Sequence, residues 1–478
     1  MAHQIFKNAL ILSTTQVVSR ILSFTFFLII ARYFGSEYFG KYYYVYTLIF
    51  LLTFISDSGL SAFIVREIAK AKQQVGHLLI HSVIIRIFLS TLVYILLIIS
   101  VYFQPDIDVD KKNILYILGL YIFSKSLFEY SLNFFQGYEK QDIFGLLQLL
   151  NNILLVSTAI VFIYGQTYFI TFSIIPVVAT LLSAITGFFL VNRHISFNFT
   201  VSIKNLIVLM SRTIPFGLTL FISAASARMG IIMLSWLSTD IQVGHYGVAS
   251  RLVEGMMMMP IVMNKITYPL LSNLRNDIPK FQLTLETTIK ILLLGTSMFV
   301  IIGTVYAEYI ITILFTNIYI DAVVVLQILL WVLLASFPNY IIGHALFSAD
   351  KQGKVLRITG FILFVNILLH FILIPKYGII GAASTVLVTT YVTFVGYILE
   401  LRHDFKVNNI LKDCFKIIFL CIILVTIGVV AKRIIAEVYT LLLLIFSFLF
   451  CISMFKIVSK NELKSLKGFI LQKDEALI

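Results

Sequence analysis

Apolar runs of about 20 residues alternate with short polar segments along almost the whole chain. About 20 apolar residues in a helix cross a hydrocarbon core of roughly 30 Å, so the pattern predicts about fourteen membrane-spanning helices. The runs are continuous, unlike the alternating segments of transmembrane strands. The helices are expected at residues 8–31, 38–60, 79–103, 113–135, 144–164, 167–191, 207–236, 243–271, 285–304, 320–345, 355–374, 378–401, 411–431 and 437–457.

Composition supports a membrane protein throughout. The 478 residues are 60% hydrophobic and 12% charged, whereas a soluble domain is about 25% charged. The formal net charge is +13, and no Lys/Arg run is dense enough to follow a nucleic-acid backbone. We therefore expect an all-α polytopic membrane protein that binds no nucleic acid.

Basic residues predict the orientation of the chain. With both termini in the cytoplasm, the cytoplasmic segments carry about three times as many Lys and Arg residues as the outer segments, as the positive-inside rule requires. The acidic loop at residues 106–110 then lies outside. The segment 62–78 is too polar to span and predicts an amphipathic helix on the cytoplasmic face.

A short repeat predicts two related halves. Gly40, Tyr42 and Leu48 recur at one fixed spacing as Gly244, Tyr246 and Leu252, each time where a second long helix opens. The copies have the same membrane sense, as in transporters with parallel repeats. We expect a six-helix lobe at 1–206, a second at 207–404, an extra helix pair at 405–458 and a cytoplasmic tail at 459–478.

Ionisable residues inside predicted spans are candidate functional groups, because burying a charge in the membrane is costly. Arg20 and Arg228 have no acid within one helical turn, so they are candidates to form a fork for phosphate; the alternative is pairing across helices with Asp57, Glu129 or Glu254. Arg251 is a third candidate.

Other charged residues in the predicted spans have structural explanations. Lys125 with Glu129, and Arg251 with Glu254, are spaced to pair along one helix face. Arg86 lies near a predicted cytoplasmic helix end, where long side chains extend to the interface. The candidate proton or cation sites are Asp57, Glu129 and Glu254.

Motifs for enzymatic chemistry are missing from the sequence. It has no GxxxxGK[ST] loop for ATP, and no spacing typical of a nucleophile–base pair. Cys414, Cys421 and Cys451 fit neither a zinc site nor a disulfide framework. We expect no enzyme activity, no metal site and no cofactor, with energy from a H⁺ or Na⁺ gradient, the membrane potential or the substrate gradient.

Five segments together resemble a known family. They are SRILSF…ARYFG at 19–35, GKYYYVYTL at 40–48, RTIPFGL at 212–218, VGHYGVASRLVE at 243–254 and YGIIGAAS at 377–384. In order and spacing they are similar to the polysaccharide transporter branch of the MOP superfamily, the Wzx-type O-antigen flippases, which are related to the lipid II flippases. The resemblance covers essentially the whole chain.

The resemblance implies two six-helix lobes, often with two added helices, around a central cationic cavity. It implies alternating access in a bacterial inner membrane, carrying undecaprenyl-diphosphate-linked oligosaccharide to the outer leaflet for O-antigen, lipopolysaccharide or capsule. A polysaccharide polymerase and a chain-length regulator are the implied protein partners. Arg20 matches the cavity arginine of the SR-x-L motif in lipid II flippases.

One position departs from the family pattern. The usual Arg-x-Asp is Arg228-Met229-Gly230 here, which leaves an ion site at that position without its acid. Aromatic residues of the repeat suit either stacking on sugar rings or anchoring at the membrane interface; they are Tyr42, Tyr43, Tyr44, Tyr46 and Tyr246.

We therefore predict a flippase in which Arg20, Arg228 and Arg251 bind the diphosphate. The first alternative is a cation-coupled multidrug exporter of the same superfamily, which would need an acidic cavity. The second is a scaffold of a polysaccharide polymerase complex.

Overall fold

The computed structural model describes residues 2–70, 75–104, 107–193, 202–405 and 408–454. In that part of the chain every regular element is helical, and no strand occurs. The predicted tail at 459–478 and Asp106 of the acidic loop lie outside it. The helices are α1 (Ala2–Asp57), α2 (Leu60–Lys70), α3 (Val75–Tyr102), α4 (Val109–Gly119), α5 (Tyr121–Gly137), α6 (Gln141–Tyr164), α7 (Phe169–Phe172), α8 (Ile175–Asn192), α9 (Ile203–Leu237), α10 (Asp240–Met256), α11 (Met258–Asn273), α12 (Ile278–Val305), α13 (Ala307–Phe315), η1 (Asn317–Tyr319), α14 (Ala322–Ser348), α15 (Gln352–Leu401), α16 (Asn408–Ala431) and α17 (Glu437–Met454).

Two of these helices each contain two predicted spans. Helix α1 is interrupted at Gly35, with φ of 80°, and α15 at Gly378, with φ of 55°. Both glycines adopt the positive-φ region that side chains with a Cβ avoid. The two kinks separate residues 8–31 from 38–60 and 355–374 from 378–401, as the hydrophobic pattern predicts.

Other predicted spans are built from two shorter helices. Helices α4 and α5 divide the expected span 113–135, and α10 and α11 divide 243–271. Among the described residues, nine helices are long and apolar enough to cross a membrane, and the kinked α1 and α15 each count once. The helical class is therefore as expected, while the interruptions depend on local backbone geometry that hydropathy does not encode.

The predicted amphipathic helix at 62–78 is correct in kind and wrong in length. Helix α2 buries Leu60, Phe63, Ile64 and Ile68 on one face and ends at Lys70. Residues 75–78 belong to the membrane helix α3 instead. Their apolar character continues that of α3, which explains the shorter amphipathic segment.

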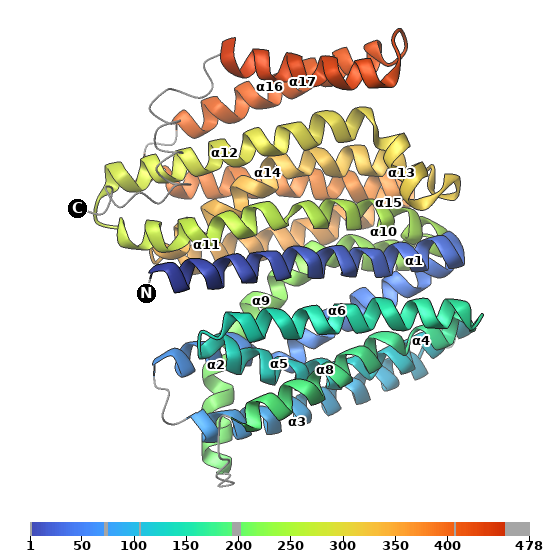
Figure 1. The fold of residues 1–478 in the computed structure, drawn as a ribbon, viewed down its shortest axis with the longest axis vertical. Coiled ribbons are helices and arrows are strands. Elements are labelled where there is room, and N and C mark those ends of the chain that lie inside the picture. Colours follow the sequence, from blue (N-terminus) through green and yellow to red (C-terminus); the bar gives the residue numbers. More distant parts are fainter. Residues whose placement is uncertain (1, 71–74, 105–106, 194–201, 406–407, 455–478) are drawn as a thin grey trace. The chain divides into compact units, whose positions relative to one another are not determined.

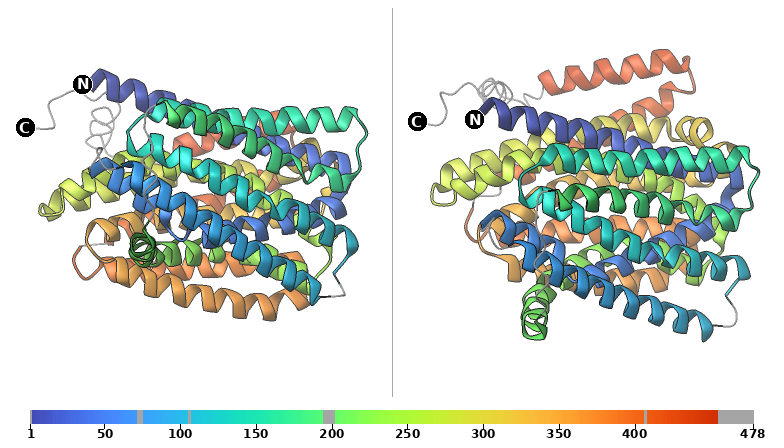
Figure 2. Two further views of the ribbon diagram at one scale, coloured as in Figure 1. Left: turned by 90° about the horizontal axis from the view of Figure 1, so that it is seen from below. Right: turned by 60° about the horizontal axis from the view of Figure 1, so that its bottom comes forward.

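The helices group into two units of dense packing. Unit 1 consists of the described residues within Met1–Arg251, Phe315–Tyr319 and Thr359–Thr385. In it, α6 lies along α1, and α5 packs against α3 and α8 (Figures 1 and 2). This arrangement places polar residues from α2, α3, α5 and α6 close to one another. The chain-order lobes at 1–206 and 207–404 stay a prediction.

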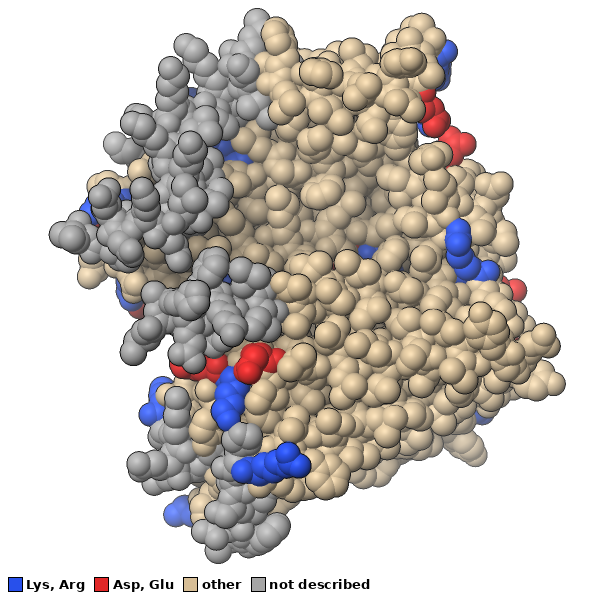
Figure 3. Space-filling view, in the orientation of Figure 1, with Lys and Arg blue, Asp and Glu red and all other residues tan. Residues whose placement is uncertain are grey.

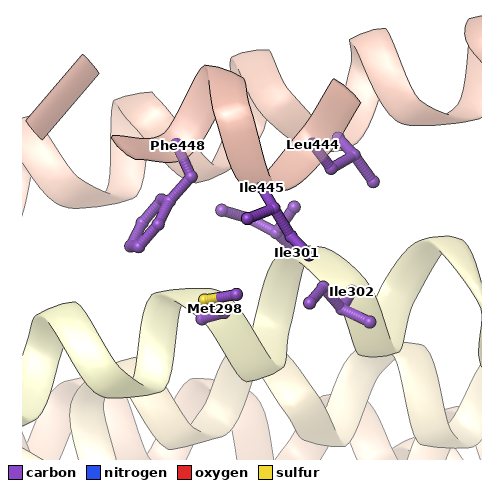
Figure 4. Close-up of a pocket in the computed structure, with 6 residues that line it drawn as sticks. All are labelled: Met298, Ile301, Ile302, Leu444, Ile445 and Phe448. Atoms are coloured by element: carbon purple, nitrogen blue, oxygen red, sulfur yellow. The ribbon is translucent and has the colours of Figure 1, made fainter. Parts of the chain in front are cut away.

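Unit 2 consists of the described residues within Leu252–Leu314, Ile320–Ile358 and Val386–Ile478. Helix α12 forms its centre and packs against α14 and α16. Between α12 and α17 lies a narrow gap that is lined by apolar side chains and has no room for a water molecule. Figure 4 shows the side chains that line this gap, which are Met298, Ile301, Ile302, Leu444, Ile445 and Phe448. Such a gap offers nothing to a charged headgroup.

Surface polarity follows the pattern of membrane helices. On the face drawn in Figure 3, long tracts of the described surface are uncharged, and Lys, Arg, Asp and Glu gather mostly near helix ends. Large apolar side chains such as Phe88, Phe364 and Phe419 are exposed. A soluble protein seldom exposes so much contiguous apolar surface, so lipid is the medium that suits these helices.

Candidate functional site

The two copies of the repeat pack against each other in unit 1, where α1 meets α10. A Cβ on Gly40 would lie 1.8 Å from the carbonyl oxygen of Asp240, and one on Gly244 would lie 2.1 Å from that of Ser36. Real Cβ atoms do not approach other atoms so closely, so both positions need glycine. The repeated glycines therefore allow the two helices to approach at backbone distance.

This close approach fixes the position of Tyr43. Its ring covers Gly247 of α10, where a Cβ would lie 2.6 Å from the ring. Its hydroxyl is 3.1 Å from the Ser250 hydroxyl. Tyr43 is fully buried, as is Tyr42. Neither predicted role, interfacial anchor or stacking platform for a sugar ring, fits these two buried rings, because neighbouring aromatic rings cover them.

Arg251 lies among aromatic rings of α1. Its guanidinium carbon is 3.6 Å from the ring centre of Phe27, 4.9 Å from that of Tyr43 and 5.3 Å from that of Tyr46. Cations are attracted to aromatic faces by the ring quadrupole, and the effect grows when water is excluded. A guanidinium held through its face keeps its in-plane N–H groups directed to whatever lies at its edge.

Arg228 of α9 reaches the same tyrosine. Its Nη1 donates to the Tyr43 hydroxyl at 3.5 Å, and its guanidinium carbon lies 5.4 Å from the ring centre of Phe50. Arg228 and Arg251 each make further contacts as well. The structure thus brings two of the three predicted arginines to one aromatic residue. We call Phe27, Tyr43, Arg228 and Arg251 the arginine–tyrosine centre.

Arg20 lies on α1 and is exposed. It precedes Phe27 by two helical turns, which puts the two residues on one face of α1, roughly 10 Å apart along its axis. It also has a contact partner. The predicted triplet therefore divides into two residues that share Tyr43 and a third two turns away.

Asp57, a candidate ion site, is bound to a protein cation. Its carboxylate lies 2.7 Å from Arg86 Nη2 and accepts a 2.7 Å hydrogen bond from the Ser61 hydroxyl. The prediction that Arg86 extends to the interface is wrong, because its side chain is only 2% exposed. The carboxylate partner offsets much of the cost of burying this guanidinium. The sequence offered one signal for this pair, because Asp57 and Arg86 lie in consecutive predicted spans near the same predicted side of the membrane.

Glu129 is also neutralised within the protein. Lys125 Nζ lies 2.7 Å from its carboxylate, one turn away on α5. This confirms the pairing that the four-residue spacing predicts. Glu254, the third candidate ion site, is partly buried near the end of α10 and falls in unit 2.

A polar pocket lies beside these ion pairs in unit 1. It is an open pocket of about 230 Å³ between α2, α5 and α6. Among its residues only Glu129 is a candidate from the sequence, because the others are uncharged and lie far apart in the chain. The lining residues are Ser61, Ala62, Val65, Glu129, Leu132, Asn133, Gln136, Phe144 and Gln148. The described residues contain no cluster of three His, Cys, Asp or Glu side chains suited to a metal.

A second charged cluster lies where Lys41 meets the start of α4. Lys41 Nζ lies 2.8 Å from Asp108, 3.1 Å from Glu37 and 3.5 Å from Asp110. The hydrogen bond from Lys41 lowers the pKa of the Asp108 carboxyl below its usual value. These ion pairs join segments that the charge pattern places on one side of the membrane, which agrees with the predicted order of the loops.

Comparison with known proteins identifies relatives over most of the chain. The family described as "Polysaccharide biosynthesis protein" matches residues 5–275. The "Capsular polysaccharide biosynthesis protein CapF" of Staphylococcus aureus is 23% identical over 405 residues, which cover 82% of this chain and 98% of that protein.

Solved structures with the same fold are membrane transporters. The lipid II flippase MurJ in an inward closed conformation aligns with a TM-score of 0.76 at 19% identity, over 93% of this chain and 98% of that one. An inward-facing multidrug resistance MATE family transporter of the MOP superfamily aligns with a TM-score of 0.65 at 16% identity, over 80% and 95%. The predicted fold class, an all-α polytopic membrane protein of MOP type, is confirmed.

Proposed function

This chain belongs to the polysaccharide biosynthesis protein family and has the fold of MOP-superfamily transporters, and from that premise we propose that it is a lipid-linked oligosaccharide flippase. Its substrate is an undecaprenyl-diphosphate-linked repeat unit for a surface polysaccharide, either O-antigen or capsule. The protein moves this substrate from the cytoplasmic to the outer leaflet of a bacterial inner membrane by alternating access.

The observation that carries this proposal is the meeting of two guanidinium groups at Tyr43. Arg228 donates to its hydroxyl, and Arg251 lies against its ring. A diphosphate presents several acceptor oxygens, and arginine matches such groups with two parallel N–H donors. Aromatic contacts with Phe50 and Phe27 orient the two guanidinium planes. The centre therefore suits the charged part of this substrate.

Arg20 extends the same basic track. Arg20 lies two helical turns before Phe27, the ring that Arg251 contacts. A diphosphate would therefore meet Arg20 first, roughly 10 Å from Phe27. Neither phosphate nor sugar crosses hydrocarbon unaided, because desolvating polar groups is costly. In the proposed mechanism the arginines replace the water around the diphosphate, and the polyprenyl tail stays in lipid.

Ion coupling by Asp57 or Glu129 stays a proposal. A proton or Na⁺ at either site would have to displace Arg86 or Lys125, each 2.7 Å from its carboxylate. Glu254 remains the other candidate. A polysaccharide polymerase and a chain-length regulator are the protein partners that this function would require in the membrane.

The proposal is tested with the full chain reconstituted in liposomes that contain undecaprenyl-diphosphate-linked oligosaccharide. Transfer of the sugar between leaflets is measured by its accessibility to an added lectin. Arg228→Ala and Arg251→Ala are each expected to lower the rate about tenfold, which corresponds to about 1.4 kcal/mol. Arg275→Ala, which removes an exposed arginine paired with Asp350, is the control. Wild-type rates in both centre variants would refute the assignment.

The multidrug exporter is the alternative that shares this fold. The same liposomes, loaded with a cationic dye and given a H⁺ or Na⁺ gradient, distinguish the two functions. Dye transport without sugar transfer would favour the exporter. A scaffold for a polymerase complex would move neither compound.

A further inference from the structure

We infer that the polar pocket between α2, α5 and α6 is a subsite for a sugar ring of the lipid-linked oligosaccharide. The inference rests on the proposed function and adds to it a place where the carbohydrate itself is bound. The pocket volume of about 230 Å³ lies just below the range of roughly 300–1,000 Å³ typical of drug-sized ligands, which limits the occupant to a single ring. All its lining residues belong to unit 1.

Side-chain amides give the pocket its hydrogen-bonding capacity. Gln136 and Gln148 line it, and neither side-chain amide makes a hydrogen bond with another residue in the part of the chain that the structure describes. An amide offers both donors and an acceptor, and each sugar hydroxyl needs both. Gln136 is exposed and Gln148 partly buried, so a ligand can reach them from the protein surface.

A hydrogen-bonded network supports the back of the pocket. The Ser61 hydroxyl donates to Asp57 at 2.7 Å and accepts from Arg86 Nη2 at 2.9 Å and from Asn133 Nδ2 at 3.0 Å. The network holds Asn133 in one orientation, while its amide oxygen makes no hydrogen bond within the described residues. A binding group that is fixed before the ligand arrives costs less entropy on binding.

The charge balance of the pocket favours a neutral ligand. Its one lining carboxylate, Glu129, is bound by Lys125 at 2.7 Å, and the nearby Asp57 is bound by Arg86 at the same distance. Neither a free cation nor a phosphate therefore finds an uncompensated charge. A carboxylate in an ion pair still accepts hydrogen bonds from hydroxyl groups, because it has about four lone-pair sites.

Apolar side chains complete the lining. Phe144 contributes an aromatic ring, and Val65 and Leu132 contribute aliphatic surface. A sugar ring presents C–H groups on its faces and hydroxyl groups around its edge. A site with a few polar groups among apolar ones recognises such a ligand better than a site that is polar throughout.

The position of the pocket suits the loading of substrate. Its residues lie at the ends of predicted spans 38–60, 113–135 and 144–164 that the charge pattern places in the cytoplasm. A Cβ on Gly145 would lie 2.4 Å from the Thr15 hydroxyl, so α1 borders α6 at this level. Arg20 follows Thr15 by five residues, roughly 8 Å along α1. Arg20 is thus near this level of α1, on a face turned by about 140° from that of Thr15.

The test compares two lipids on the purified full chain by native mass spectrometry titration. One is undecaprenyl diphosphate, and the other is undecaprenyl diphosphate carrying the repeat unit extracted from producing cells. The double variant Gln136→Leu, Gln148→Leu removes both amides that lack protein partners. Asn152→Leu is the matched control, because this amide lies one turn further along α6, bonds to the Gln148 carbonyl and does not line the pocket.

We expect the wild-type chain and the Asn152→Leu control to bind the sugar-bearing lipid about tenfold more tightly than the bare lipid. The double variant should reduce this preference to less than about twofold while its affinity for the bare lipid stays unchanged. A preference that survives in the double variant overturns the subsite, as does an equal loss for both lipids. A wild-type chain that binds neither lipid refutes the proposed function itself.

Discussion

Unit 1 holds its buried cations in two different ways. Beside the polar pocket, Arg86 and Lys125 each lie 2.7 Å from a carboxylate. At the arginine–tyrosine centre, Arg251 lies 3.6 Å from the ring centre of Phe27 and 4.9 Å from that of Tyr43. A carboxylate accepts hydrogen bonds from the N–H groups of the cation. An aromatic ring instead contacts the flat face of a guanidinium.

Under the proposed function, the difference separates charge that stabilises the fold from charge that contributes to substrate binding. A buried ion pair is electrically neutral, and removing one partner leaves a costly unpaired charge. A cation on aromatic rings is retained at a gain of about 2 kcal/mol when water is excluded, and Arg251 makes further contacts besides these rings. The following substitutions test whether the two places behave so differently.

The largest effect is expected from breaking the buried ion pair. Arg86→Met should destabilise the protein by about 3–5 kcal/mol, because Asp57 would stay buried without its partner. Thermal unfolding in detergent, followed by size-exclusion chromatography, measures the loss. Replacing both residues, Asp57→Leu with Arg86→Met, should recover most of it. An unchanged unfolding temperature in Arg86→Met would mean that this pair is not structural.

This pair also marks the limit of what the sequence predicts. Hydropathy places the spans, and the spacing of Lys125 and Glu129 predicts their pairing, because both depend on one helix. Asp57 and Arg86 lie on different helices, so their contact depends on how α1 and α3 pack. The aromatic contacts of Arg251 depend in turn on the approach of α1 to α10. The sequence therefore predicts which charged residues are candidates, and the packing of the helices determines which groups they contact.

The next effect tests the helix approach that positions the arginine–tyrosine centre. Gly244→Ala would place a methyl group 2.1 Å from the Ser36 carbonyl oxygen, and overpacking of this kind costs about 1–3 kcal/mol. We expect a lower unfolding temperature together with slower sugar transfer in liposomes.

Gly255→Ala on the same helix is the matched control. No atom lies within 4 Å of its would-be Cβ, so it should leave stability unchanged or raise it by about 0.5–1 kcal/mol. If the two variants lose stability equally, the loss comes from replacing any glycine of α10, and the close approach at Gly244 has no special role.

A smaller effect distinguishes a planar cation from a point charge. Arg251→Lys keeps the positive charge but loses the flat guanidinium that lies on Phe27, so sugar transfer should fall about tenfold, equivalent to about 1.4 kcal/mol. Lys125→Arg makes the reverse change at an ion pair and should stay within about twofold of wild type. Equal effects in both variants would contradict the distinction between face-held and edge-held cations.

The smallest effect concerns a single hydroxyl group. Tyr43→Phe retains the ring beneath Arg251 but removes the acceptor of Arg228 and the partner of Ser250. One hydrogen bond contributes about 1 kcal/mol net, so a several-fold decrease in affinity for undecaprenyl diphosphate is expected. Stability should fall only by about the 1 kcal/mol of a lost hydrogen bond, because the ring still covers Gly247. Tyr43→Leu, which removes the aromatic face as well, should lower this affinity further. If Tyr43→Phe and Tyr43→Leu bind the lipid equally well, the aromatic face contributes nothing to lipid binding.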